Sequence, residues 1–72
     1  ELTENINKAI NELPDTYRDT FTLSRFGDLT NPQIADKLGV SIKTVEYRIS
    51  QALKILRVKL KDYLPLLSFL SL

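Results

Sequence analysis

Breaker residues divide this 72-residue chain into segments that have the periodicity of helices. Pro14, Gly27, Gly39 and Pro65 separate stretches in which apolar residues recur at intervals of three and four. That spacing gathers apolar side chains on one face of a helix, and no stretch alternates between apolar and polar residues for long enough to indicate a strand. The sequence therefore predicts an all-α domain of four to five helices.

The first two helices are predicted on either side of Pro14. The first covers about residues 3–12, with Thr3 as its N-cap, and ends before the proline. The second is expected to start at Pro14 and Asp15, because proline suits a first helical turn and the positive end of the helix dipole stabilises a carboxylate. Gly27 is expected to close this helix.

The next two helices have clear start signals. Thr30 followed three residues later by Gln33 is typical of a capping box, and Gly39 is expected to end the helix that begins there. Ser41 can cap a fourth helix. No breaker comes before Pro65, so this fourth helix is predicted to be long, about 23 residues.

The fourth helix is predicted to be amphipathic. At about 100° per residue, its apolar residues fall within an arc of roughly 120°, and mostly polar residues lie opposite. We expect the apolar face to pack and the opposite face to be free to bind. The apolar set is Ile42, Val45, Ile49, Ala52, Leu53, Leu56, Leu60 and Tyr63, and the opposite set is Lys43, Tyr47, Gln51, Lys54 and Lys61. Ile55 and Val58 lie off the apolar arc, which the pattern does not explain.

The composition excludes several kinds of functional site. The chain contains no cysteine and no histidine, which removes disulfides, thiolate nucleophiles, imidazole catalysis and the usual zinc ligands. Its two glycines stand apart, so the sequence has no glycine-rich phosphate loop. We therefore expect no enzymatic activity, no metal and no cofactor.

Charge is unevenly distributed along the chain. Residues 1–36 contain three basic and seven acidic side chains, whereas residues 37–72 contain seven basic and two acidic ones. A basic half of this kind attracts polyanions such as nucleic acids. On charge alone, a solvated helix whose lysines only confer solubility is the other interpretation.

Residues 30–52 have the pattern of a helix-turn-helix, in which a short glycine-terminated helix precedes an amphipathic helix with a basic outer face. Ala35 allows close approach of the two helices, and Gly39 can adopt the positive φ that the turn requires. Val45 and Ile49 would hold the second helix against the first. The second helix of this motif enters the major groove of DNA, so it is predicted to be a long recognition helix.

The polar face of that helix supplies candidate DNA contacts. Lysine can donate to guanine, glutamine can pair with adenine, and tyrosine can contact a thymine methyl or a phosphate. The candidate DNA-binding residues are Lys43, Thr44, Glu46, Tyr47, Arg48, Gln51 and Lys54. The candidate phosphate contacts are Thr30, Asn31, Gln33, Ser41 and Arg57.

Three of these assignments have alternatives. Tyr47 can equally be a partly buried ring that covers a neighbouring side chain. Thr30 and Gln33 are first of all a helix cap, with a phosphate at that helix N-terminus as a further option. Glu46 can accept a hydrogen bond from cytosine or form a pair within its own helix.

With these features the sequence resembles region 4, the C-terminal domain of bacterial sigma factors of the extracytoplasmic-function type. The resemblance extends from about Ile6 to Leu60. The matching residues are Leu13, Pro14, Tyr17, Arg18 and Phe21 before the helix-turn-helix, and Leu29, Thr30, Ile34, Ala35, Leu38, Gly39, Val40, Ser41, Thr44, Val45, Arg48, Ile49 and Ala52 within it. The spacing of Leu13, Pro14, Tyr17 and Arg18 ahead of the motif makes the resemblance strong.

The resemblance implies a cytoplasmic domain that binds double-stranded promoter DNA at the minus-35 element through its last long helix. It also implies partners: the β flap of the RNA polymerase core, and an anti-sigma factor that sequesters the protein. Promoter melting belongs to a separate domain, so this fragment is expected to bind DNA without opening it. Glu46, Gln51 and Leu53 stand where the family tends to have basic residues, which implies fewer phosphate contacts and weak binding by the isolated domain.

The two ends of the chain lead to further expectations. The polar start, Glu1 to Glu4, is unlike a secretion signal, so we expect a piece of a longer cytoplasmic protein. Residues 1–64 are predicted to form the domain, and residues 65–72 an uncharged apolar tail too short to span a membrane. The tail is expected either to fold back as a short fifth helix, or to fill the groove for the flap or anti-sigma factor, or to join two copies of the chain.

Two other functions compete with this interpretation. The output domain of a response regulator shares the Leu-Thr-Asn, Ile-Ala and Lys-Thr-Val pattern but lacks the approach through Leu13, Pro14, Tyr17 and Arg18. A helical module that binds an acidic protein and never contacts DNA is the second alternative. Duplex affinity that falls steeply with salt, with a log–log slope near −4 for about four or five phosphates, would favour DNA binding.

Overall fold

The computed structural model describes residues 2–66 and confirms the predicted all-α fold. Over this range the chain forms four α-helices and one 3-10 helix, without a strand. The elements are α1 (Leu2–Asn11), α2 (Asp15–Phe26), α3 (Asn31–Leu38), α4 (Ile42–Lys59) and the 3-10 helix η1 (Lys61–Leu66). Residues 67–72, most of the predicted apolar tail, lie outside the described range, and the predicted roles of that tail stay predictions.

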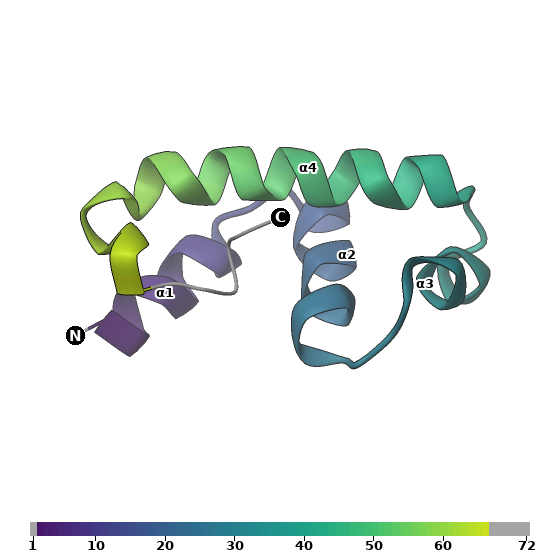
Figure 1. Ribbon diagram of the computed structural model, residues 1–72, viewed down its shortest axis with the longest axis horizontal. Coiled ribbons are helices and arrows are strands. Elements are labelled where there is room, and N and C mark those ends of the chain that lie inside the picture. The colour runs from purple at the N-terminus through teal and green to yellow at the C-terminus, as the bar shows by residue number, and fades with distance from the viewer. Residues whose placement is uncertain (1, 67–72) are drawn as a thin grey trace.

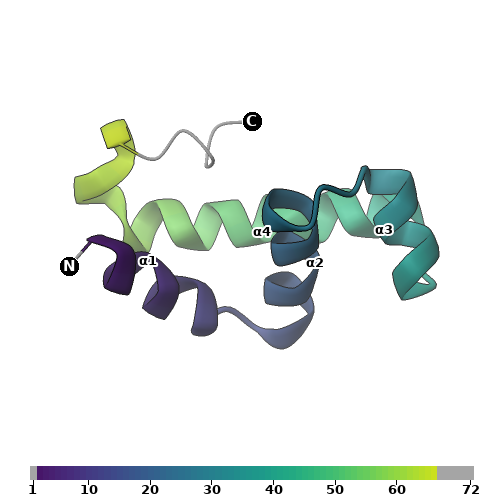
Figure 2. The same ribbon diagram turned by 90° about the horizontal axis from the view of Figure 1, so that it is seen from below.

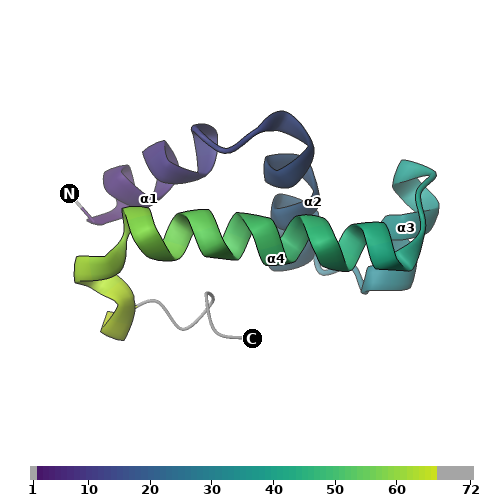
Figure 3. The same cartoon turned by 90° about the horizontal axis from the view of Figure 1, so that it is seen from above.

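Helix α4 forms the long axis of the domain, and α1, α2 and α3 lie along one side of it (Figure 1). The domain measures 35 × 20 × 18 Å. Figures 2 and 3, which view it from below and above, show α1 on one side of α4 and η1 on the other. The core fills the space between α4 and the three other helices, and its largest fully buried side chains include Phe21, Ile34, Val45, Leu53 and Leu56. One long face of α4 is therefore left without a covering helix.

Both predicted caps of the helix-turn-helix are confirmed. The Gln33 amide donates to the Thr30 hydroxyl at 3.3 Å, and the Thr30 amide donates to the Gln33 side chain at 2.8 Å. At the start of α4, the Thr44 amide donates to the Ser41 hydroxyl at 3.0 Å. Gly39 ends α3 with a φ of 68°, the left-handed conformation that glycine adopts without strain.

The predicted length of the last helix is wrong. Helix α4 has 18 residues, not about 23, and ends at Lys59; its C-cap, Leu60, has a φ of −113° and a ψ of 25°, which are not helical. Pro65 opposes a longer helix in two ways. Its ring would clash with the preceding helical turn, and it disfavours the α conformation at the residue before it. In η1, the Tyr63 hydroxyl accepts a hydrogen bond from the Asn5 amide of α1 at 3.0 Å, which holds the redirected chain.

Two predicted helix starts also need correction. Helix α1 already includes Thr3, so this residue is not its N-cap. Pro14 precedes α2 in the cap position, with no side-chain cap bond, and the helix begins at Asp15. The prediction that Gly27 closes α2 is confirmed: Gly27 is the C-cap, with a right-handed φ of −97°, and the next residue, Asp28, has a left-handed φ of 57°. Aspartate tolerates this conformation better than most side chains do, because its carboxylate can bond to nearby backbone groups.

The packed face of α4 is confirmed at all its core positions except the first. Ile42, the first residue of α4, is 44% exposed. Ile55, which the pattern did not explain, is half-buried against the core. Val58 is 74% exposed. Tyr63 packs against the core from η1 instead of from α4.

Candidate nucleic-acid interface

Helices α3 and α4 form the predicted helix-turn-helix, joined by residues 39–41. Ile34 and Ala35 of α3 are buried, as are Val45 and Ile49 in the first turns of α4. These four side chains belong to one hydrophobic cluster, so the recognition helix is held against α3 by apolar contacts. The small Ala35 side chain, 6% exposed, allows the close approach that the sequence predicted.

The outer face of α4 lies opposite the three packed helices (Figure 1). Lys43, Tyr47 and Lys54 are exposed there, and Gln51 is half-buried between them. Spacings of four, four and three residues place these side chains on one side of the helix. At a rise of about 1.5 Å per residue, the row from Lys43 to Lys54 is about 16 Å long, comparable with a major groove about 12 Å wide.

The other candidate residues of α4 flank this row. Thr44 and Arg48 are half-buried on one flank, whereas Glu46 is exposed on the other. The Thr44 hydroxyl accepts a hydrogen bond from Ser41 at 2.9 Å, so both hydroxyls already take part in the cap. Arg57 is half-buried near the C-terminal end of α4.

A shallow depression joins the start of α3 to the flank of α4. It is about 260 Å³ in volume and is lined by Arg25, Asn31, Glu46, Ile49 and Ser50. The structure thus brings two predicted site residues, Asn31 and Glu46, to one surface. Arg25 was not predicted to be part of the site; its guanidinium lies 5.6 Å from the centre of the Phe21 ring, one turn earlier on the same helix.

The ring of Tyr47 makes a contact that the helical pattern missed. It meets Tyr17 of α2 edge to face, with 6.3 Å between ring centroids and 77° between ring planes. Tyr47 is nevertheless 57% exposed, so it covers a neighbour and also remains accessible. The pKa of the Tyr17 phenol is raised above its usual 10.0, mainly by a hydrogen bond with Tyr47 and to a smaller extent by partial burial. The charge of Arg48 acts in the opposite direction.

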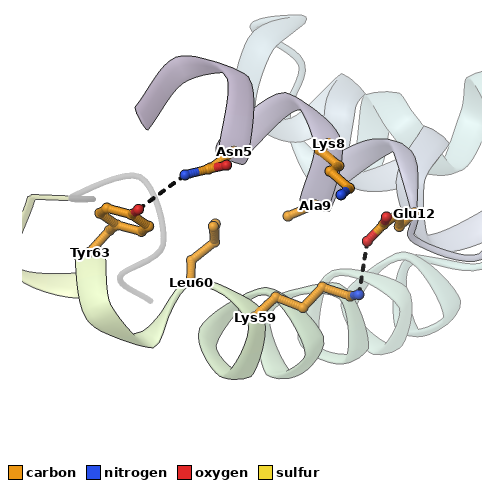
Figure 4. Close-up of a pocket in the computed structure, with 7 residues that line it drawn as sticks. All are labelled: Asn5, Lys8, Ala9, Glu12, Lys59, Leu60 and Tyr63. Carbon is orange, nitrogen blue, oxygen red and sulfur yellow. Dashed lines mark hydrogen bonds and ion pairs between the residues drawn. The ribbon is translucent and has the colours of Figure 1, made fainter. Parts of the chain in front are cut away.

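A second depression, of about 320 Å³, lies between α1 and the end of α4 (Figure 4). Within it Lys59 donates to Glu12 at 3.0 Å, and Asn5 donates to Tyr63 at 3.0 Å. The hydrogen bond and charge of Lys59 hold the pKa of the Glu12 carboxyl below its usual 4.5. These contacts join α1 to α4 and η1, and none of the candidate DNA-binding residues lines this depression.

Known proteins agree with this architecture. A family described as "Sigma-70, region 4" matches residues 3–56. The chain belongs to this family. The match favours a region 4 domain over a response-regulator output domain or a helical interaction module, and it covers all four α-helices up to the last turn of α4.

Two similar proteins come from Bacillus subtilis (strain 168). RNA polymerase sigma factor SigV is 36% identical over 55 residues, which cover 76% of this chain and 33% of SigV. ECF RNA polymerase sigma factor SigW is 34% identical over 62 residues, which cover 86% of this chain and 33% of SigW. This region 4 domain therefore spans about a third of the length of the curated relatives it matches. No solved structure matches it significantly.

None of the helices between residues 2 and 66 is long and apolar enough to cross a bilayer. No group of three or more acidic residues in the same range is arranged to hold a metal ion.

Proposed function

We propose that this domain binds the minus-35 promoter element as part of a sigma factor that directs transcription initiation by RNA polymerase. The observation that supports this most is the outer face of α4, where Lys43, Tyr47 and Lys54 are exposed, while the opposite face of the helix packs against the core. A recognition helix needs this combination, because its packed face fixes its direction while its free face enters the groove.

The proposed contacts divide into two groups. Lys43, Tyr47 and Gln51 contact base edges, since they lie along the outer row near the N-terminal half of α4. Phosphates are contacted from α4 and from the start of α3, which borders the same face. The proposed phosphate contacts are Thr30, Asn31, Gln33, Ser41, Thr44, Arg48, Lys54 and Arg57. Glu46 accepts a hydrogen bond from a cytosine amine at the flank of the groove or forms a pair within its own helix.

DNA binding can be tested with the domain alone. A duplex is first selected from a random-sequence pool, and its Kd is then measured by fluorescence anisotropy between about 50 and 200 mM salt. We expect a log–log slope near −4, which corresponds to about four or five neutralised phosphates. Lys54→Ala should reduce this slope by about 1. Lys8→Ala, an exposed lysine of α1, is the matched control and should leave it unchanged.

A slope near zero, or equal effects of Lys54→Ala and Lys8→Ala, would contradict DNA binding by the outer face of α4. The first result would favour the helical module that binds an acidic protein. The second would indicate attraction by the net charge of the domain, without a defined interface.

We propose that the assembly partners are the RNA polymerase core, through its β flap, and an anti-sigma factor. This follows from the family and from the names of the relatives, both sigma factors. Cytoplasmic location and the absence of an enzymatic reaction follow from the same proposal, since a promoter-recognition domain acts on polymerase and DNA by binding. Co-purification of the domain with the isolated flap tests the polymerase contact: a stable complex is the expected result, and no complex would contradict the proposal.

A further inference from the structure

Two tyrosines from different helices meet beside the recognition face. Tyr47 comes from the second turn of α4 and Tyr17 from the first turn of α2, thirty residues earlier in the chain. Their rings stand nearly perpendicular, at 77° and with 6.3 Å between centroids, which is a favourable arrangement for two aromatic rings. Tyr17 lies outside the helix-turn-helix, so this contact links the recognition face to the preceding part of the domain.

Tyr17 is held in place by the helix that bears it. Phe21, one turn later on the same side of α2, is fully buried in the core against α4. The next residue, Arg18, pairs with Asp15 at 3.2 Å, and α2 itself begins directly after Pro14. Because its neighbours are fixed, the half-buried Tyr17 ring presents a rigid surface to Tyr47.

Tyr47 has fewer fixed neighbours than Tyr17. It is 57% exposed and lies in the outer row of α4, so without Tyr17 its side chain could adopt several orientations. The ring contact with Tyr17 favours one of them. An interface side chain that is already fixed loses less conformational freedom on binding, which improves both affinity and discrimination.

We propose that Tyr17 is a positioning residue for DNA recognition. It holds Tyr47 in one orientation and thereby sets which base pairs the domain prefers at the positions that Tyr47 contacts. This inference rests on the proposed function, because it requires that Tyr47 contacts DNA. Tyr17 itself acts through Tyr47 and need not touch a base.

A double-mutant cycle on the selected duplex tests the proposal. Kd is measured for Tyr17→Leu, Tyr47→Ala and the double variant, on that duplex and on versions with single base-pair changes. At the base pairs that Tyr47 contacts, Tyr17→Leu should lower the ratio of Kd between changed and selected duplexes by about 3- to 10-fold. The double variant should discriminate no worse than Tyr47→Ala alone. Tyr17→Phe, which keeps the ring, should retain most of the preference.

Two controls separate positioning from a general loss of structure. Tyr63→Phe removes a phenol that bonds to Asn5 on the far side of the domain, so it should leave base preference unchanged. Binding of the Tyr17 variants to non-specific duplex should also be unchanged, because their charges are intact. Absorbance titration should show the Tyr17 phenol ionising at lower pH in Tyr47→Phe, since a hydrogen bond that stabilises the protonated phenol is lost.

Unchanged base preference in Tyr17→Leu, or effects of Tyr17→Leu and Tyr47→Ala that multiply independently, would overturn the proposal. The proposal would also be overturned if Tyr47→Ala binds every duplex like the unaltered domain. That result would leave the proposed DNA binding by α4 intact. If the unaltered domain binds no duplex, the proposed function fails with it, so the two failures are distinguishable.

Discussion

Gly39 offers a test of the turn that orients the recognition helix. Its φ is 68°, and a Cβ placed on it would meet no other atom within 4 Å. Replacing it with alanine therefore adds no clash and isolates the cost of a left-handed conformation. That cost is about 1–2 kcal/mol for a residue with a Cβ, and the lower entropy of the unfolded alanine chain offsets about 0.4–1 kcal/mol of it.

We therefore expect Gly39→Ala to lower the free energy of unfolding by about 1 kcal/mol, which corresponds to about 4–8 °C in Tm for a domain of this size. Gly39→Asn should cost less than Gly39→Ala, because asparagine tolerates the left-handed region. The assay is urea unfolding followed by circular dichroism, with an unchanged m value for both variants. A loss above about 3 kcal/mol would indicate a clash that the structure does not contain. A clear gain in stability would show that the turn at this residue is not left-handed.

Three further predictions concern the core, a cap and an ion pair. Leu53→Ala, at a fully buried position of α4, should lower the free energy of unfolding by about 2–5 kcal/mol in urea, and a loss below about 1 kcal/mol would refute the described core. Thr30→Ala should cost about 1 kcal/mol because the capping box is lost, and an unchanged urea midpoint would exclude that cap. Lys59 lowers the pKa of Glu12, so their contact stabilises the fold above pH 4.5 and is lost as the pH falls through the lowered pKa. The difference in Tm between the unaltered chain and Glu12→Gln should therefore shrink on acidification below pH 4.5, and a constant difference would contradict the ion pair.

Local signals in the sequence predicted much of the fold. The caps at Thr30 and Ser41 depend on residues three positions apart, so sequence alone is sufficient to predict them. The packed face of α4 was predicted for the same reason, since helical periodicity is a local property. The exception is Ile42, the first residue of α4, because periodicity contains no information about which positions of a helix its neighbours cover.

Contacts between distant residues explain what the sequence did not predict. The end of α4 at Lys59 is accompanied by the bond between Asn5 and Tyr63, which are 58 positions apart. The ring pair of Tyr17 and Tyr47 is also a contact between separate helices. Helical spacing places Tyr47 on the outer face correctly, but which neighbour its ring meets depends on how α2 crosses α4.

The candidate site was predictable to a similar extent. The outer row of α4 follows from its periodicity, and exposure of Lys43, Tyr47 and Lys54 agrees with it. Arg25 was missed because it comes from α2 and reaches the site only through the packing of α2 against α4 and α3. The DNA contacts themselves remain predictions.

The central claim is that the outer face of α4 lies in the major groove, and a tethered cleavage probe tests it most directly. The chain has no cysteine, so Ser50→Cys on the exposed flank of α4 and Thr22→Cys on the exposed side of α2 each offer one attachment point for an iron chelate. On the selected duplex, the probe at position 50 should cut both strands within the bound site, in the pattern of a major-groove reagent, and the probe at position 22 should cut weakly or not at all. Strong cutting from position 22 with none from position 50, in variants that bind with unchanged Kd, would contradict the account.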